Sequence, residues 1–236
     1  MISPITRRYF VFGSAAVFAR GQSRMSVLEA FDHLLLGVSD LDHGIDWFER
    51  RARVRAVVGG VHPGRGTRNA LASLGGDHYL EIIAPDPAQA TADSQYQLST
   101  LTEPRLINFA VKTTDIDSTA ASLRRAGVQT IGPMDGSRRT ASGALLRWKA
   151  LRVESKFRSG EINPIPFFIE WAGDSTHPSK DAPTGCTIED LRFEHPQADE
   201  LKSALRSMGL EANVATADRA RIIAIIQTPN GRLELG

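Results

Sequence analysis

The sequence predicts an α+β fold built from repeated units of one strand, one helix and three strands. Two observations carry this prediction. The segment 31–54 and the segment 106–128 share one order of apolar and polar positions, and aligning 40–42 (DLD) with 115–117 (DID) gives an offset of 115 − 40 = 75 residues. A shorter copy begins near residue 187. Repeats of this kind usually stack to bury a common core. We therefore expect two units to form one cup, followed by a third module.

Each of the first two units opens with a strand and a capped helix. Ser39 or Asp40 caps the first helix and Thr114 or Asp115 the second, because a side-chain oxygen there can accept from free backbone N–H groups. The apolar positions of the helices recur at i, i+4 and i+7, as a buried helix face requires, at Leu41, Ile45 and Phe48 and at Ile116, Ala120 and Leu123. Three strands should follow each helix, near 53–58, 66–74 and 78–84 in the first unit and near 127–131, 143–153 and 165–172 in the second.

The third unit begins with the strand TIEDLRF at 187–193 and continues with a helix opened by Pro196, a favoured first helical position. The strands RIIAIIQT and RLEL follow around a Pro-Asn-Gly turn. Polar, proline-bearing linkers separate the units. The expected division is a leader over 1–25, a two-module domain over 30–185 and the third module over 186–236. That module should pack beside the first two or pair with its copy in a homodimer.

The amino-acid composition limits the kinds of molecule that this protein is expected to bind. The 28 basic and 27 acidic residues nearly balance, which argues against a general nucleic-acid or membrane-surface role. The single cysteine, Cys186, excludes an internal disulfide framework. Apolar runs all fall short of the roughly 20 residues that a membrane-spanning helix needs. The expected partner is a small molecule.

The first 25 residues have three interpretations, one of which is a disordered or strand-like leader. Paired arginines at 7–8 precede a short apolar stretch, the pattern of a twin-arginine export signal. Alternatively, Met25 is the first residue of the protein. The chain is accordingly expected in the cytoplasm, or exported if the signal is real.

One carboxylate lies within an apolar strand, so its negative charge needs a partner inside the protein. Glu81 lies within the run YLEII, and burying an unpaired carboxylate costs several kcal/mol. Because side chains alternate along a strand, we expect Glu81 to face the cup, with His33 on the neighbouring strand. The same reasoning places Glu170 on the cup face of the last strand. Arg68 or Arg147 could compensate Glu81 by an ion pair.

Five ordered motifs strengthen the fold assignment. They are DHLLLGVSDLD, HPGRGTRNALASLGGDHYLEII, GALLRWKAL, PFFIEW and HPS. Over residues 30–195 this set resembles the glyoxalase-like domain family of the vicinal oxygen chelate superfamily. The resemblance implies paired βαβββ modules, with metal ligands on the first and last strands of each module.

Carried over by position, the ligand positions are His33, Glu81, Asn108 and Glu170. One imidazole and two carboxylates, His33, Glu81 and Glu170, suit a divalent metal such as Fe, Mn, Zn or Ni. Asn108 departs from the family pattern, since many relatives carry His or Glu at this position. A neutral amide is a poor ligand for a soft transition metal, though an adequate one for harder cations. Glu81 or Glu170 would serve as general base.

The remaining site assignments concern substrate binding. The glycine-rich stretch 62–69 predicts a pocket rim with His62, Thr67 and Asn69 as substrate contacts, or else only a glycine-rich turn. Asn108 and Arg147 complete the expected substrate-binding set. Arg138 and Arg139 could add cations suited to carboxylate recognition, but they are expected in a solvated loop. The resulting hypothesis is a metal-dependent lyase, isomerase or dioxygenase acting on an oxygen-rich substrate. The alternative is a metal-free binding or sequestration protein of the bleomycin-resistance type.

Overall fold

The computed structural model describes residues 24–89, 96–140 and 143–236. The expected leader over 1–25 therefore lies outside the described residues, except for its last two. None of the helices described is both long enough and apolar enough to cross a membrane.

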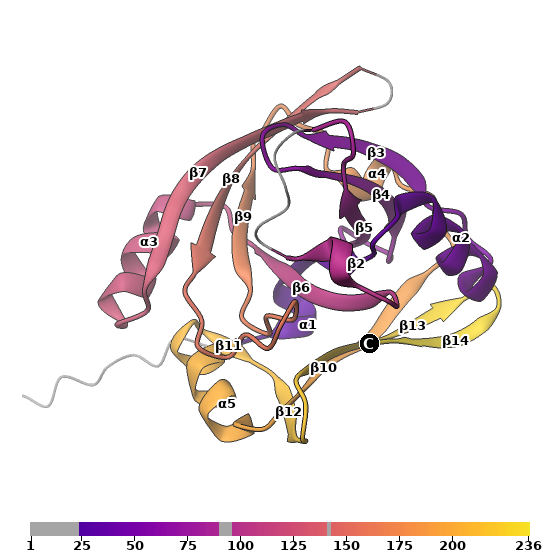
Figure 1. Cartoon of the computed structure of the whole chain (residues 1–236). Helices are drawn as coiled ribbons and strands as arrows, with labels where there is room; N and C mark the ends of the chain where they lie inside the picture. Colours follow the sequence, from indigo (N-terminus) through magenta and orange to yellow (C-terminus); the bar gives the residue numbers. More distant parts are fainter. Residues whose placement is uncertain (1–23, 90–95, 141–142) are drawn as a thin grey trace, which may run out of the picture.

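Two modules share one eight-stranded sheet. The first comprises β2 (Phe31–Gly37), α2 (Leu41–Ala52), β3 (Val57–His62), β4 (Thr67–Ser73) and β5 (Tyr79–Pro85). The second comprises β6 (Arg105–Lys112), α3 (Ile116–Arg125), β7 (Thr130–Arg139), β8 (Leu145–Val153) and β9 (Phe167–Trp171). A short 3-10 helix, η1 (Leu98–Thr100), lies between them. The strand order is β3-β4-β5-β2-β6-β9-β8-β7, and the sheet curls with α2 and α3 on its outer side (Figure 1). The α+β prediction with two modules forming one cup is confirmed.

The two modules join along one seam and approach each other at their edges. Strands β2 and β6 pair antiparallel at the centre of the sheet. At the edges, a Cβ on Gly60, whose φ is +147°, would lie 2.5 Å from the carbonyl oxygen of Arg139. Arg138 Nη1 also donates to the carbonyl of Gly59. These contacts close the curl of the sheet.

Both helices begin as their sequences predict. The side chain of Asp40 accepts from the backbone N–H of His43 at 2.8 Å, and that of Asp115 accepts from Ser118 at 2.9 Å. Helix α2 ends at Arg53 in the left-handed conformation, with φ of 57°. Because the chain needs this turn and a short connection, β3 begins at residue 57 and not near residue 53.

The main core lies between the outer face of the sheet and the elements that cover it. Fully buried side chains from the strands meet those of the helices, among them Leu34, Leu36, Phe109, Phe48 and Ile116. The inner face of the sheet carries a different set of residues, described below.

The third unit contains β10 (Thr187–His195), α5 (Ala198–Ser207), β11 (Leu210–Glu211), β12 (Asn213–Thr216), β13 (Arg221–Thr228) and β14 (Gly231–Leu235). Its sheet has the order β12-β10-β13-β14, with β12 parallel to β10. In the first two modules the last strand lies parallel beside the first, so the strand pairing of the third unit differs. Phe193 of β10 packs on Phe109 of β6 with ring centroids 5.3 Å apart, so this unit covers the outer side of the eight-stranded sheet.

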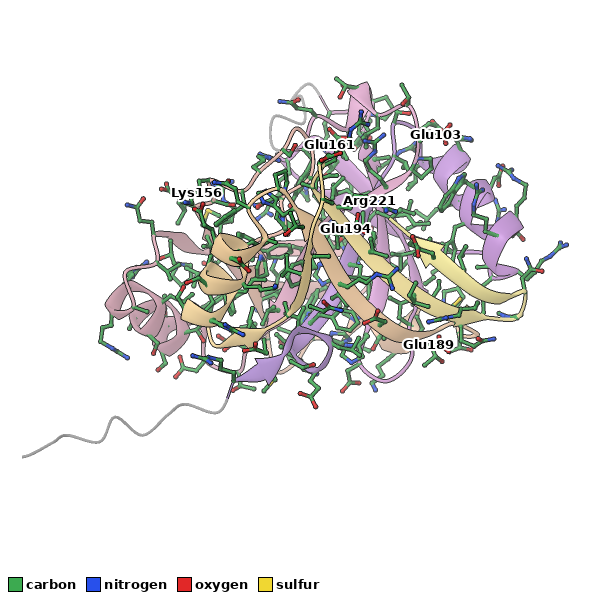
Figure 2. All side chains as sticks on the ribbon, turned by 90° about the horizontal axis from the view of Figure 1, so that it is seen from below. Glu103, Lys156, Glu161, Glu189, Glu194 and Arg221 are labelled. Atoms are coloured by element: carbon green, nitrogen blue, oxygen red, sulfur yellow. The ribbon has the colours of Figure 1, made fainter. Side chains whose placement is uncertain are left out.

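The other face of the third sheet is charged. Figure 2 views it from below and shows Glu194 and Arg221 on this sheet. Arg221 pairs with Glu194 at 3.3 Å, and Arg192 pairs with Glu234 at 3.1 Å. Such partly exposed pairs contribute little stability, but they make this face polar. Homodimer formation through this unit stays a prediction.

Two short helices and one short strand complete the fold. Strand β1 (Met25–Ser26) pairs parallel with β11 and leads into α1 (Val27–Ala30). Helix α4 (Pro178–Asp181) lies in the linker between the second module and the third unit.

Candidate active site

The curled sheet encloses a cavity of about 330 Å³. Its lining combines ionisable and polar groups of the first module with aromatic and cationic groups of the second. Its members include His33, His62, Thr67, Asn69, Tyr79, Glu81, Arg138, Trp148, Arg152, Phe167 and Trp171. Glu81 is the only carboxylate among the described lining residues.

A buried histidine links two carboxylates at this cavity. His33 Nδ1 lies 2.7 Å from Asp32 Oδ1, and His33 Nε2 lies 3.3 Å from Glu81 Oε2. All three side chains are less than 10% exposed. Asp32 and His33 are neighbours in β2, and the pairing of β2 with β6 is shifted between Phe31 and His33. A local irregularity of this kind interrupts strict alternation and re-aims side chains. We call Asp32, His33 and Glu81 the buried relay.

The far end of the buried relay is held by the second module and the linker. His177 Nε2 lies 3.0 Å from Asp32 Oδ2, and Trp171 Nε1 donates to the same oxygen at 3.2 Å. His177 is itself positioned by Ser179, whose Oγ lies 2.8 Å from its Nδ1. Both oxygens of Asp32 are therefore satisfied.

The near end of the relay is held by the glycine-rich stretch. Asn69 Nδ2 donates to Glu81 Oε1 at 2.7 Å, and His62 Nε2 lies 3.4 Å from the same oxygen. His62 Nδ1 lies 2.8 Å from Thr67 Oγ1. Glu81 is thus compensated by His33, Asn69 and His62. Neither Arg68 nor Arg147 contacts it among the described interactions.

These contacts set the charges of the site. Burial alone would lower the pKa of His33, but hydrogen bonds to the carboxylates of Asp32 and Glu81 outweigh it and raise that pKa to about 9. Burial would raise the pKa of Glu81, yet the hydrogen bond from His33 and the nearby His62 lower it to about 2. The pKa of Asp32 is likewise held below its usual range against burial, by hydrogen bonds from His177 and His33.

His62 behaves differently from His33. Burial lowers its pKa below 6.5, and the attraction of Glu81 only partly offsets this effect. The positive charges of Arg138 and Arg65 lower it further. At neutral pH, His62 is therefore a neutral imidazole beside an ionised carboxylate.

Glu170 lies on the opposite face of the sheet from the cavity. Its Oε2 accepts from the backbone N–H of Ile116 at 2.8 Å, at the start of α3. There it satisfies a helix N–H that has no partner within the helix. The expectation that Glu170 joins His33 and Glu81 as metal ligand or base is therefore wrong. Phe167, Ile169 and Trp171 are the residues of β9 that line the cavity.

Two expected substrate contacts are also misplaced. Asn108 is buried, and its Oδ1 accepts from the backbone N–H of the next residue, Phe109, at 2.7 Å; it is not a lining residue. Arg147 pairs with Asp174 and is more than half exposed. Trp148 and Arg152, of the opposite parity on β8, line the cavity instead. His62, Thr67 and Asn69 do line it, as expected.

Four site residues escaped the sequence reasoning. Asp32 and His177 belong to the quoted motifs DHLLL and HPS, so the motifs themselves were the available signal. Trp171 ends the motif PFFIEW. Arg138, expected in a solvated loop, is 5% exposed and lines the cavity.

The donor set does not fit the expected metal. In the described part of the chain, no group of three or more His, Cys, Asp or Glu side chains is arranged to hold a metal ion. Glu170 is remote, and an N–H of Asn69 occupies one oxygen of Glu81. We therefore derive the chemistry from the chain's own side chains.

Comparisons with known proteins agree with the fold. A family model described as a glyoxalase-like domain matches residues 31–209. A hypothetical protein from Staphylococcus aureus has a TM-score of 0.65 at 18% identity, covering 82% of this chain and 90% of its own.

Two epimerases are more distant. Methylmalonyl-CoA epimerase from Mycobacterium tuberculosis has a TM-score of 0.42 at 22% identity, and the match covers 65% of this chain and 93% of the epimerase. The Streptomyces coelicolor enzyme in complex with 2-nitronate-propionyl-CoA has a TM-score of 0.45 at 21% identity, and the match covers 62% of this chain and 97% of that enzyme. No curated protein matches significantly. The chain belongs to the glyoxalase-like domain family.

Proposed function

We propose that this protein is an enzyme that transfers a proton to or from a small, oxygen-rich substrate bound in the cavity. One observation carries the proposal. His62 and Glu81 form a pair at the cavity, with Nε2 and Oε1 3.4 Å apart, and the rest of the buried relay supports this pair from behind. Clusters of perturbed titratable groups in a cavity are typical of catalytic sites.

The pair is suited to accept one proton. At rest it consists of neutral His62 and ionised Glu81, and a proton taken from the substrate converts it to an imidazolium beside a carboxylate. Glu81 stabilises that product, because the new positive charge lies next to its negative charge. We assign the acceptor role to His62, because Glu81 already accepts from Asn69 and is held ionised by His33. Thr67 orients the ring of His62.

His33 and Asp32 act as positioning residues. The imidazolium of His33 keeps Glu81 ionised and fixes its Oε2, while Asp32 fixes Nδ1 of His33. A scaffold without chemistry gains nothing from burying these charges, since buried ionic groups are weak contributors to stability. The metal-dependent reaction expected from the family pattern lacks its third ligand, Glu170. Proton transfer supports the isomerase or lyase class.

The test is exchange of substrate protons with solvent. Small carboxylic acids bearing a carbonyl or hydroxyl at the neighbouring carbon are incubated with the protein in D₂O, and ¹H NMR follows loss of the carbon-bound proton. We expect exchange by the wild type, at least 100-fold slower exchange by His62→Gln and by Glu81→Gln, and unchanged exchange by Glu189→Gln on the third unit. Equal exchange by His62→Gln and the wild type would refute the assignment.

A second candidate is binding without turnover. The apolar and aromatic residues of the lining, including Phe167, Trp148 and Trp171, favour it because such surfaces retain planar ligands. This function predicts ligand binding without proton exchange for the wild type, and it corresponds to the sequestration alternative.

A further inference from the structure

Arg138 is a buried cation for which the described residues supply no anionic partner. Its side chain is 5% exposed and lines the cavity. Its Nη1 donates to the carbonyl of Gly59, and no described carboxylate lies within 4.0 Å of it. Burying a charge without a counter-charge is costly, and buried charges are normally paired. The cavity therefore has a place for an anion.

An aromatic surface begins beside this cation. A Cβ on Gly136 would lie 2.4 Å from ring atoms of Trp148, so the indole occupies the space that a side chain at 136 would fill. Gly136 and Arg138 are two residues apart on β7 and share its inner face. Arg138 and Trp148 therefore both line the cavity, with the guanidinium directed toward Gly59 on β3 and the indole over Gly136.

The aromatic surface continues to the buried relay. Trp148 and Trp171 have ring centroids 5.5 Å apart, and Trp171 donates to Asp32. Tyr79 stacks on His33 with centroids 4.5 Å apart. Flat apolar surface thus extends from Arg138 toward the groups that would exchange the proton.

A second arginine adds to the positive charge of the cavity. The Nε of Arg152 is buried without a hydrogen-bond partner in the described structure, and Arg152 lines the same cavity. The only lining carboxylate, Glu81, already accepts from Asn69 and contacts His33 and His62. The lining therefore favours an anionic ligand.

We propose that the cavity binds a small organic carboxylate with a planar, apolar body. The carboxylate pairs with the guanidinium of Arg138, whose planar fork matches two carboxylate oxygens, and the body lies on Trp148 and Trp171. A volume of about 330 Å³ sets the ligand at the small end of those that protein pockets accept. This inference rests on the proposed function, since it names the class of substrate.

The probe is benzoate, with benzamide as its neutral counterpart. Binding is measured by calorimetry and by quenching of tryptophan fluorescence. We expect benzoate to bind the wild type at least tenfold more tightly than benzamide. Arg138→Gln should remove this preference, Arg138→Lys should retain part of it, and Arg219→Gln, at an exposed position of the third unit, should leave it unchanged. Thermal melting establishes that each variant is folded.

A second variant tests the aromatic surface. Gly136→Ala forces the indole of Trp148 to move, so it should weaken benzoate and benzamide by a similar factor of several fold. Glu81→Gln should strengthen benzoate binding, because it removes the negative charge from the lining. Equal affinity of the wild type for the two probes, absence of benzoate binding, or full benzoate affinity in Arg138→Gln would overturn the inference.

Benzoate carries no exchangeable carbon-bound proton beside its carboxylate, so this result is independent of catalysis. Loss of the charge preference with intact proton exchange would refute the ligand class alone. An intact preference with no proton exchange would refute the proposed function alone.

Discussion

Phe167 occupies in the second module the position that Glu81 occupies in the first. Glu81 pairs with Leu35 across β2 and β5, and Phe167 pairs with Ala110 across β6 and β9. Leu35 and Ala110 are related by the 75-residue offset, since 110 − 35 = 75. The same offset relates His33 to Asn108. The duplicated unit thus keeps its ionisable pair in one copy and has a phenyl ring and an amide in the other.

A carboxylate at position 167 should create a metal site. The rings of Phe167 and His33 have centroids 5.6 Å apart, so Phe167→Glu adds a third donor near His33 and Glu81. We expect Ni²⁺ or Zn²⁺ to bind this variant at least tenfold more tightly than the wild type, as measured by calorimetry. Ile169→Glu, on the same strand and face, is the matched control and should gain less. Equal affinity of the two variants would contradict the positional equivalence.

The wild-type protein should not retain a stoichiometric transition metal. Only the first module supplies an ionisable pair, His33 and Glu81, since the corresponding residues of the second module are Asn108 and Phe167. An N–H of Asn69 also competes at Glu81. We expect elemental analysis after purification without chelator to give well below one Fe, Mn, Zn or Ni per chain, and chelator to leave the melting temperature unchanged. One equivalent of metal that His33→Gln abolishes would restore the metal-dependent hypothesis.

The buried relay should make stability depend on pH in two windows. The pKa of His33 is raised from 6.5 to about 9, so its contribution is complete below pH 6.5 and is lost as the pH rises through 9. The pKa of Glu81 is lowered from 4.5 to about 2, so its contribution is present above pH 4.5 and is lost as the pH falls toward 2. The two shifts overlap in the contact between His33 and Glu81, so they do not add, and the shift of His33 also includes its hydrogen bond to Asp32.

Urea unfolding between pH 5 and pH 10 tests the alkaline window. The difference in unfolding free energy between the wild type and His33→Gln should shrink as the pH rises toward 10. The exposed His43→Gln serves as control and should follow the wild type at every pH. Parallel curves for the wild type and His33→Gln would show that His33 is not an imidazolium between two carboxylates.

Glu170→Gln should reduce stability without affecting the cavity. The variant loses the charge at the N-terminus of α3 and keeps a weaker acceptor for the Ile116 N–H. We expect a loss of about 1 kcal/mol in the free energy of unfolding, with unchanged benzoate affinity. A large fall in affinity with little loss of stability would return Glu170 to the binding site.

The fold was predictable because the sequence contains two similar copies of one structural unit. The capping residues Asp40 and Asp115, the helix periodicity and the apolar strands all identify the two modules, and each is a local signal. The cup face of β2 and β5 also followed from alternation, which placed His33 beside Glu81.

The second half of the site was not predictable in the same way. Strand β9 has five residues, FFIEW, and its two adjacent phenylalanines fit either face. The prediction assigned Phe168 and Glu170 to the cavity face of β9, but Phe167, Ile169 and Trp171 occupy that face. Asp32 was not predicted because it is the neighbour of His33 in β2, and strict alternation places neighbouring side chains on opposite faces of a strand. The irregular pairing of β2 with β6 between Phe31 and His33 removes that constraint. The partners Arg138 and His177 depend on contacts across 79 and 145 residues, which no local pattern encodes.

The single seam between β2 and β6 makes the two halves of the cup exchangeable in principle. The groups proposed to handle the proton all precede the linker 86–104 in the chain, whereas the residues proposed to select the ligand follow it. The first set comprises His33, His62, Thr67, Asn69 and Glu81. Recombination at the linker 86–104 would therefore give chimaeras that inherit proton-handling groups from one parent and ligand preference from the other. Duplication followed by divergence of one copy thus allows the range of accepted molecules to change while the reactive groups are kept.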